Sequence, residues 1–221
     1  MPKWGKTIIA ILLLPLCAGG GMALARILKQ TGDATTFWMP LLGGIGAWLV
    51  IYAIIPRPMW FYVFGHELTH ALWTWLFGGK LKKFRVTSKG GHVVITKSNF
   101  LISLAPYFFP VYAALLVLIY VVGNLIWNWS PWLPWFHFFL GTAYAFHVTF
   151  TVHIIQKRQT DIVDEGYFFS AVVIYLGNLL GLLIGIPLLA GSPPLMTVFI
   201  WWGEKTLIVL RWIQELAHKI V

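Results

Sequence analysis

The stretch FGHELTHALW, residues 64–73, places His66, Glu67 and His70 inside an otherwise apolar run. Residues four apart on a helix lie on one face, one turn apart, so both imidazoles can reach one cation. Glu67 follows His66 and can take a proton from an attacking water without ligating the metal. This H-E-x-x-H spacing is typical of zinc hydrolases. The sequence therefore predicts a Zn²⁺ site with His66 and His70 as ligands and Glu67 as the general base.

The elements that position this motif belong to a very apolar chain. Of its 221 residues, 59% are hydrophobic and 10% are charged, and the apolar residues come in long runs. This composition excludes an ordinary soluble domain and indicates membrane spans. The net charge of +9 comes from basic residues beside those runs, which favours contacts with lipid headgroups over nucleic acid. We expect one integral membrane domain over residues 1–221, embedded in a lipid bilayer, with no nucleic-acid partner.

Seven apolar runs are each long enough, or nearly so, to cross about 30 Å of hydrocarbon. They cover residues 7–25, 37–55, 58–77, 100–122, 136–155, 166–190 and 195–213. Glu204 and Lys205 interrupt the last run, for which an amphipathic surface helix is the alternative. The predicted fold class is an all-α polytopic membrane protein with six or seven transmembrane helices.

Alternation of these seven spans assigns each loop to one side of the membrane. One side collects twelve basic residues and the other collects three, Lys3, Lys6 and Arg57. Because basic loops stay in the cytoplasm, we expect residues 78–99 and 156–165 inside and the N-terminus outside. The expected location is a bacterial plasma membrane.

The segment that follows the HELTH helix has the pattern of a β-hairpin. The residues KKFRVT and HVVIT form two short runs typical of strands, separated by SKGG. The pattern predicts a hairpin with a Gly-Gly turn, and a solvated basic loop is the alternative.

HELTH within a span, the hairpin-like GGKLKKFRVTSKGGHVVIT and the further spans resemble the site-2 protease family of intramembrane zinc metalloproteases. The resemblance covers about residues 58–160. It implies a zinc site within the membrane that cuts transmembrane substrates near the cytoplasmic face. It also implies that the substrate unwinds and lies as a strand against the hairpin. A hairpin edge offers unpaired backbone groups to such a strand, so we expect Val93, Val94 and Ile95 to bind substrate.

The HELTH pattern leaves the third zinc ligand open. The family supplies an Asp from an N-P-x-x-D-G or L-D-G motif, and this chain has neither. The candidates are His147, His153, Asp161, Asp164 and Glu165. His147 lies ten residues before Lys157, as His70 lies ten before Lys80, so two spans running in the same direction would place both at equal depth. This argument favours His147, with Asp161 as the alternative because it has the family's ligand type.

The predicted function is that of an intramembrane zinc endopeptidase acting on a membrane-spanning or membrane-anchored protein. Ionisable side chains inside a bilayer cost several kcal/mol, which makes hydrogen bonding within a helix bundle a poor explanation for three of them. Two alternatives remain, a catalytically silent scaffold or chaperone with a metal site, and a metal or solute transporter. Glu67 favours the enzyme, because a metal cage needs no base between its histidines.

Overall fold

The computed structural model describes residues 2–87 and 90–220. Its contacts group the chain into two compact units, Thr35–Asp161 and Met1–Ala34 with Ile162–Val221. Each unit is described by itself below. The single domain expected over the whole chain stays a prediction.

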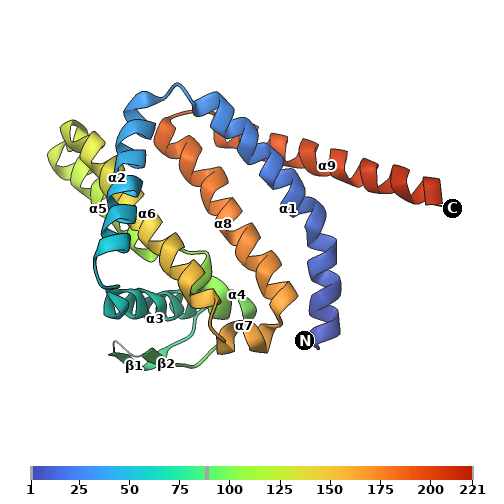
Figure 1. Cartoon of the computed structure of the whole chain (residues 1–221), viewed down its shortest axis with the longest axis horizontal. Helices are drawn as coiled ribbons and strands as arrows, with labels where there is room; N and C mark the ends of the chain where they lie inside the picture. Colours follow the sequence, from blue (N-terminus) through green and yellow to red (C-terminus); the bar gives the residue numbers. More distant parts are fainter. Residues whose placement is uncertain (1, 88–89, 221) are drawn as a thin grey trace. The chain divides into compact units, whose positions relative to one another are not determined.

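The unit Thr35–Asp161 is built around two helices, α2 (Thr35–Ile54) and α6 (Leu133–Ile155), which pack along each other (Figure 1). Two glycines permit this close approach: a Cβ on Gly44 would overlap the carbonyl group of Phe138, and one on Gly141 would overlap that of Leu41. Trp48 donates a hydrogen bond from Nε1 to Thr149 Oγ1 across the pair, at 2.9 Å. The packing fixes α6, whose C-terminal end leads to Asp161.

The HELTH motif lies on α3 (Met59–Leu76), which runs crosswise to α2 (Figure 1). The antiparallel strands β1 (Leu81–Thr87) and β2 (Gly90–Ile95) pack against α3, so the predicted hairpin is confirmed. Residues 88 and 89 lie outside the described residues. The expectation of a Gly-Gly turn was wrong, because Gly90 and Gly91 belong to β2, where Gly91 pairs with Val86.

The apolar run 100–122, expected to be one span, is broken. Residues 100–107 form α4 (Phe100–Leu104) and the 3₁₀ helix η1 (Ala105–Tyr107), and α5 (Val111–Trp127) follows at a bend of 82°. Pro110 precedes α5 and disfavours helical backbone at the residue before it, which explains a break at this point. Asn99 caps α4 by accepting a hydrogen bond from the Ile102 backbone N–H at 2.9 Å. A second 3₁₀ turn, η2 (Ser130–Trp132), leads into α6.

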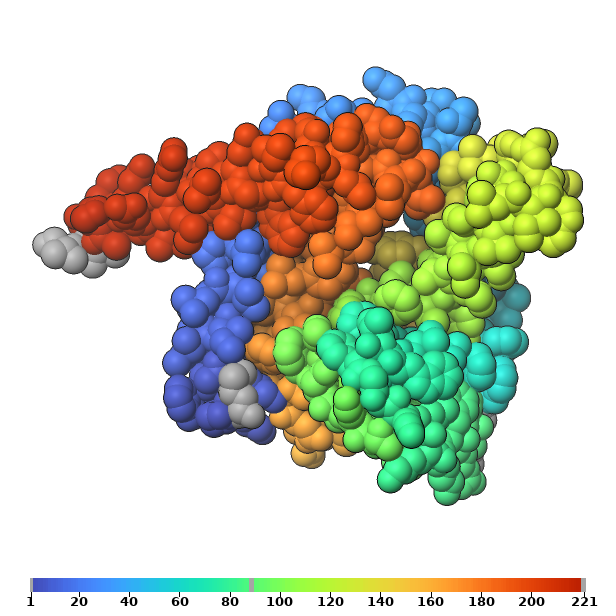
Figure 2. Space-filling view, turned by 180° about the vertical axis from the view of Figure 1, so that it is seen from behind, coloured from blue at the N-terminus to red at the C-terminus, as the bar shows by residue number. Residues whose placement is uncertain are grey.

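The other unit contains α1 (Lys3–Thr31), α8 (Tyr167–Ala190) and α9 (Leu195–Ile220), and α1 contacts both other helices. Lys6 of α1 pairs with Glu165, the last residue of the short helix α7 (Thr160–Glu165). The boundary between the two units falls within α7, after Asp161. The C-terminal part of α9, residues 211–219, is exposed throughout, and the space-filling view shows it projecting from α1 and α8 (Figure 2).

Four helices in the described residues are long and apolar enough to cross a membrane: α1, α2, the stretch from η2 through α6, and α8. The bent pair 100–107 and α5 raises the number to five if it counts as one span. The structure therefore gives four or five candidate spans by length and composition, and the six or seven expected from the sequence stay a prediction. Helix α3 is not counted because the two histidines and Glu67 lower its mean hydropathy. Helix α9 is not counted because every 18-residue window of it contains at least three charged residues, Glu204, Lys205 and Arg211.

Candidate metal centre

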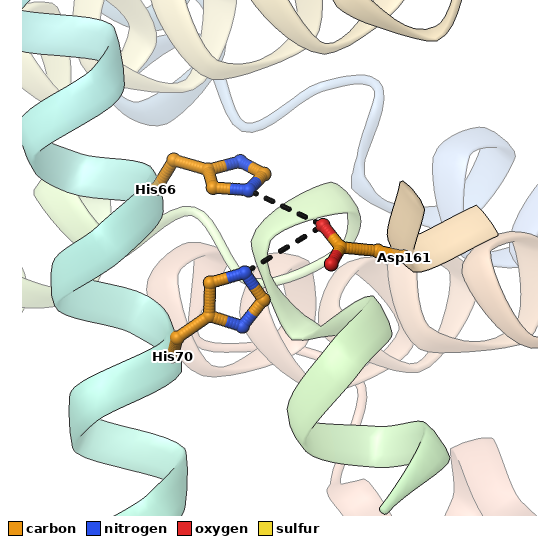
Figure 3. Close-up of side chains that lie close together, drawn as sticks. All are labelled: His66, His70 and Asp161. Carbon is orange, nitrogen blue, oxygen red and sulfur yellow. Dashed lines mark ion pairs between the residues drawn. The ribbon is translucent and has the colours of Figure 1, made fainter. Parts of the chain in front are cut away.

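One face of α3 presents His66 and His70 together (Figure 3). Their ring centroids lie 4.9 Å apart, and each side chain is only 12% exposed. The i, i+4 spacing produces this arrangement directly, because successive turns of a helix stack side chains four residues apart. The two imidazoles are therefore positioned for one shared cation.

Asp161, in the first turn of α7, supplies a carboxylate opposite the two rings (Figure 3). Its Oδ2 atom lies 3.5 Å from His66 Nε2 and 3.6 Å from His70 Nε2. Among the described residues, these three form the one group of His, Cys, Asp or Glu side chains whose ligand atoms all lie within 4.8 Å of one another. The structure thus brings Asp161, the alternative from the sequence, to the two histidines.

The other ring nitrogens of both histidines have partners elsewhere. Nδ1 of His70 donates a hydrogen bond to the carbonyl oxygen of Ile102 at 2.9 Å, since a carbonyl can only accept. Nδ1 of His66 lies 3.4 Å from the hydroxyl of Tyr62. Because Nδ1 of His70 is engaged by the Ile102 carbonyl, Nε2 is the nitrogen directed toward Asp161 and the one that would bind a metal.

The spacing of these atoms fits a zinc ion. Tetrahedral ligands at about 2.0–2.1 Å from Zn²⁺ lie about 3.3–3.4 Å from one another. The two nitrogen–oxygen distances exceed this by only a few tenths of an ångström. Two imidazoles and one carboxylate are also a ligand set found in catalytic zinc sites, which leave a fourth position open.

The two histidines favour the ionised form of the Asp161 side chain. Burial raises the pKa of its carboxyl group, but the nearby His66 and His70 outweigh burial and keep that pKa well below its usual value. Oδ2 also accepts a hydrogen bond from the Tyr107 hydroxyl at 3.0 Å. A carboxylate in this state is ready to ligate a cation.

Glu67 lies beside the two histidines and is 8% exposed. The backbone of β2 passes close to it: a Cβ on Gly91 would lie 2.5 Å from Glu67 Oε1. Glycine at this position lets the hairpin approach the predicted base. The hairpin and the base are therefore parts of one site.

The site opens into a cavity of about 520 Å³ bordered by α3, β2 and the segment before Asp161. Of the three residues expected to bind substrate, Val93 and Ile95 line this cavity, and Val94 is not among its lining residues.

His147, favoured from the sequence as the third ligand, lies apart from this group. It is on α6, 8% exposed, and it lines a second, smaller cavity of about 20 Å³ together with His66. In the described part of the chain its Nε2 atom has no hydrogen-bond partner. His153, Asp164 and Glu165 are also outside the metal-binding group, and Glu165 instead pairs with Lys6.

A comparison with protein families identifies the peptidase M50B-like family over residues 41–155, which is more than half of the chain. The chain belongs to the peptidase M50B-like family. This is the family of the site-2 proteases, which are zinc metalloproteases of membranes, so the resemblance drawn from HELTH is confirmed. The family match includes His66, Glu67 and His70 and ends six residues before Asp161. Searches of curated proteins and of solved structures give no match.

Two residues of the site, Tyr107 and Gly91, were not singled out in the sequence. Tyr107 lies in an apolar run, where a tyrosine carries no signal of its own, and its contact with Asp161 spans 54 residues. Gly91 was interpreted as part of a turn. A glycine in a strand often marks a place where another group approaches the backbone closely. Gly90 and Gly91 directly precede the predicted strand HVVIT, so this signal was present in the sequence.

Proposed function

We propose that this protein is an intramembrane zinc endopeptidase in which His66, His70 and Asp161 hold the metal and Glu67 is the general base. The observation that carries the proposal is the convergence of both Nε2 atoms on Oδ2 of Asp161, beside a buried glutamate. The family supports it, because its members are metalloproteases. The ligand set replaces His147 with Asp161.

The zinc ion, when bound, supplies an activated water and polarises the scissile carbonyl group. Glu67 accepts a proton from the attacking water and donates it to the leaving amine. The Ile102 carbonyl orients His70, and the Tyr62 hydroxyl contacts His66. These neighbours hold the rings in place, so little rearrangement is needed when the substrate arrives.

The substrate class we propose is a membrane-spanning or membrane-anchored protein, bound as a strand beside β2. Four consecutive residues of β2, 90–93, border the cavity. Because neighbouring side chains point to opposite faces, a run of four places the strand's backbone along the cavity. The sheet has two strands in the described residues, so this edge can pair with an unwound substrate segment.

Five crossings, the larger number of candidate spans, support a different orientation from the one expected from seven. With five crossings, the N-terminus lies on the same side as the hairpin and α7, because α1 and α2 cross in succession and α3 is not counted. This side carries eleven of the sixteen basic residues, and the other carries five. The positive-inside rule then places the catalytic side and the N-terminus in the cytoplasm, which differs from the outside N-terminus expected from seven crossings.

The proposal is tested by a cleavage assay on single-span membrane proteins with the wild-type chain and a Glu67→Gln variant. We expect roughly 10²–10⁴-fold slower cleavage by the variant, with zinc content unchanged, because Glu67 moves protons and is not a ligand. Equal cleavage by both would contradict the proposal. Solute flux that is equal in both chains, without cleavage in either, would support the transporter alternative instead.

A further inference from the structure

The segment 100–107, which comprises α4 and η1, lies directly behind the metal centre. It supplies one contact to each of two candidate ligands. The Ile102 carbonyl accepts the hydrogen bond from His70 Nδ1, and the Tyr107 hydroxyl donates to Asp161 Oδ2. The segment thus reaches ligands that come from two different helices, α3 and α7.

Tyr107 contacts two of the three ligands at once. Besides its 3.0 Å hydrogen bond to Asp161, its ring meets the His66 ring edge to face, with centroids 5.4 Å apart. The side chain is 0% exposed, so its hydroxyl is confined to this position. A buried hydroxyl within reach of a carboxylate fixes the rotamer of that carboxylate, because any other rotamer loses a charge-assisted hydrogen bond.

The segment itself is held by buried side chains and by a cap at its N-terminal end. Ile102 and Leu104 are fully buried, and the Asn99 side chain accepts a hydrogen bond from the backbone N–H of Ile102. Ile102 therefore has two roles: its carbonyl orients His70, and its backbone N–H is held by the Asn99 cap. The 82° bend that follows separates 100–107 from α5 and leaves this short segment at the site.

We infer that residues 100–107 orient the side chains that would hold the metal and that Tyr107 is the positioning residue for Asp161. This inference rests on the proposed function. It explains how an aspartate in the first turn of a six-residue helix keeps a fixed orientation. Tyr107 acts through Asp161, so its hydroxyl matters for metal affinity even before substrate binds.

The test is the zinc affinity of the purified full chain, measured by competition with a chromophoric chelator, for wild type and Tyr107→Phe. Loss of the hydroxyl is expected to weaken zinc binding roughly 10–100-fold, the usual effect of removing an outer contact of a ligand. The matched control is Tyr120→Phe, which removes a hydroxyl bonded to the Trp129 carbonyl away from the site. This control is expected to bind zinc as the wild type does.

Two further measurements separate positioning from a general role in folding. In an Asp161→Ala background, Tyr107→Phe is expected to change zinc affinity no further, because the two residues act as a unit. Asn99→Ala is expected to weaken zinc binding and Asn99→Asp to preserve it, since aspartate keeps the capping oxygen. If the Tyr107 hydroxyl only stabilises the fold, Tyr107→Phe will lower the unfolding temperature and leave zinc affinity unchanged.

That last result, or equal zinc affinity in wild type and Tyr107→Phe, would overturn the inference while the proposed function stands. A wild-type chain that binds no zinc would overturn the proposed function, and the inference with it. The two failures are therefore distinguishable.

Discussion

Gly91 of the hairpin lies against Glu67 of α3, so closely that a Cβ on Gly91 would come within 2.5 Å of Glu67 Oε1. The contact joins the strand that borders the cavity to the side chain proposed to move protons. In the proposed function, this contact would set the distance between a substrate strand on β2 and Glu67. A small change at residue 91 is therefore a direct probe of catalytic geometry.

Gly91→Ala is expected to slow cleavage by about 100-fold, because the new methyl group displaces the Glu67 carboxylate and misplacement by about 1 Å costs roughly that much. Zinc content is expected to be unchanged, since Gly91 is outside the metal-binding group. Cleavage rate and zinc content are measured on the same preparation. Gly46→Ala is the control, because a Cβ there meets nothing within 4 Å. Full activity in Gly91→Ala would contradict the claim that the Gly91–Glu67 contact determines the catalytic geometry.

The third ligand is decided by comparing Asp161→Ala with His147→Ala. We expect the first change to weaken zinc binding by more than the roughly 10–100-fold caused by changes outside the ligand shell. His147→Ala is expected to keep zinc, because His147 lies apart from the group. Equilibrium dialysis followed by metal analysis measures both. Zinc loss in His147→Ala alone would restore the ligand first favoured from the sequence.

Membrane orientation is tested by labelling single cysteines with a membrane-impermeant reagent in a Cys17→Ala background. Lys3→Cys and Lys82→Cys are expected to label from the same side, and Ser130→Cys from the opposite side. All three positions are exposed. Labelling of Lys3→Cys together with Ser130→Cys would mean that α3 crosses the membrane and that the N-terminus lies outside.

Removal of the metal is expected to stop cleavage and to lower the unfolding temperature, and added zinc is expected to restore both. An ion that binds only the folded chain stabilises it by about 2.7 kcal/mol at a hundred times its Kd. The Asp161→Ala variant is the control, because its unfolding temperature is expected to respond little to a chelator. Unfolding of the wild type that is indifferent to the chelator would count against a bound ion.

The sequence predicts local features of this protein well, because local spacing determines them. HELTH places two imidazoles on one helix face, and the strand pattern after it predicts the hairpin, both without knowledge of the tertiary structure. The seven apolar runs all contain helices. Whether a helix crosses a membrane depends on its charge and polarity, and α3 and α9 are too polar to be counted.

The third ligand could not be chosen by counting residues. The comparison of His147 with His70 assumed that α3 and α6 run in the same direction. In the structure α3 lies crosswise to α2, along which α6 packs, so equal distance in residues is not equal depth (Figure 1). Asp161 reaches the histidines because the chain turns after α6 into α7. Tertiary contacts of this kind, like that of Tyr107, leave no local pattern in the sequence.

The most direct measurement of the central claim is X-ray absorption at the zinc edge of the purified wild-type chain. We predict one zinc per chain with two imidazole nitrogens at about 2.0–2.1 Å and a carboxylate oxygen at about 2.0–2.2 Å. A chain free of zinc, or a zinc ion with three imidazole ligands, would contradict the account of His66, His70 and Asp161.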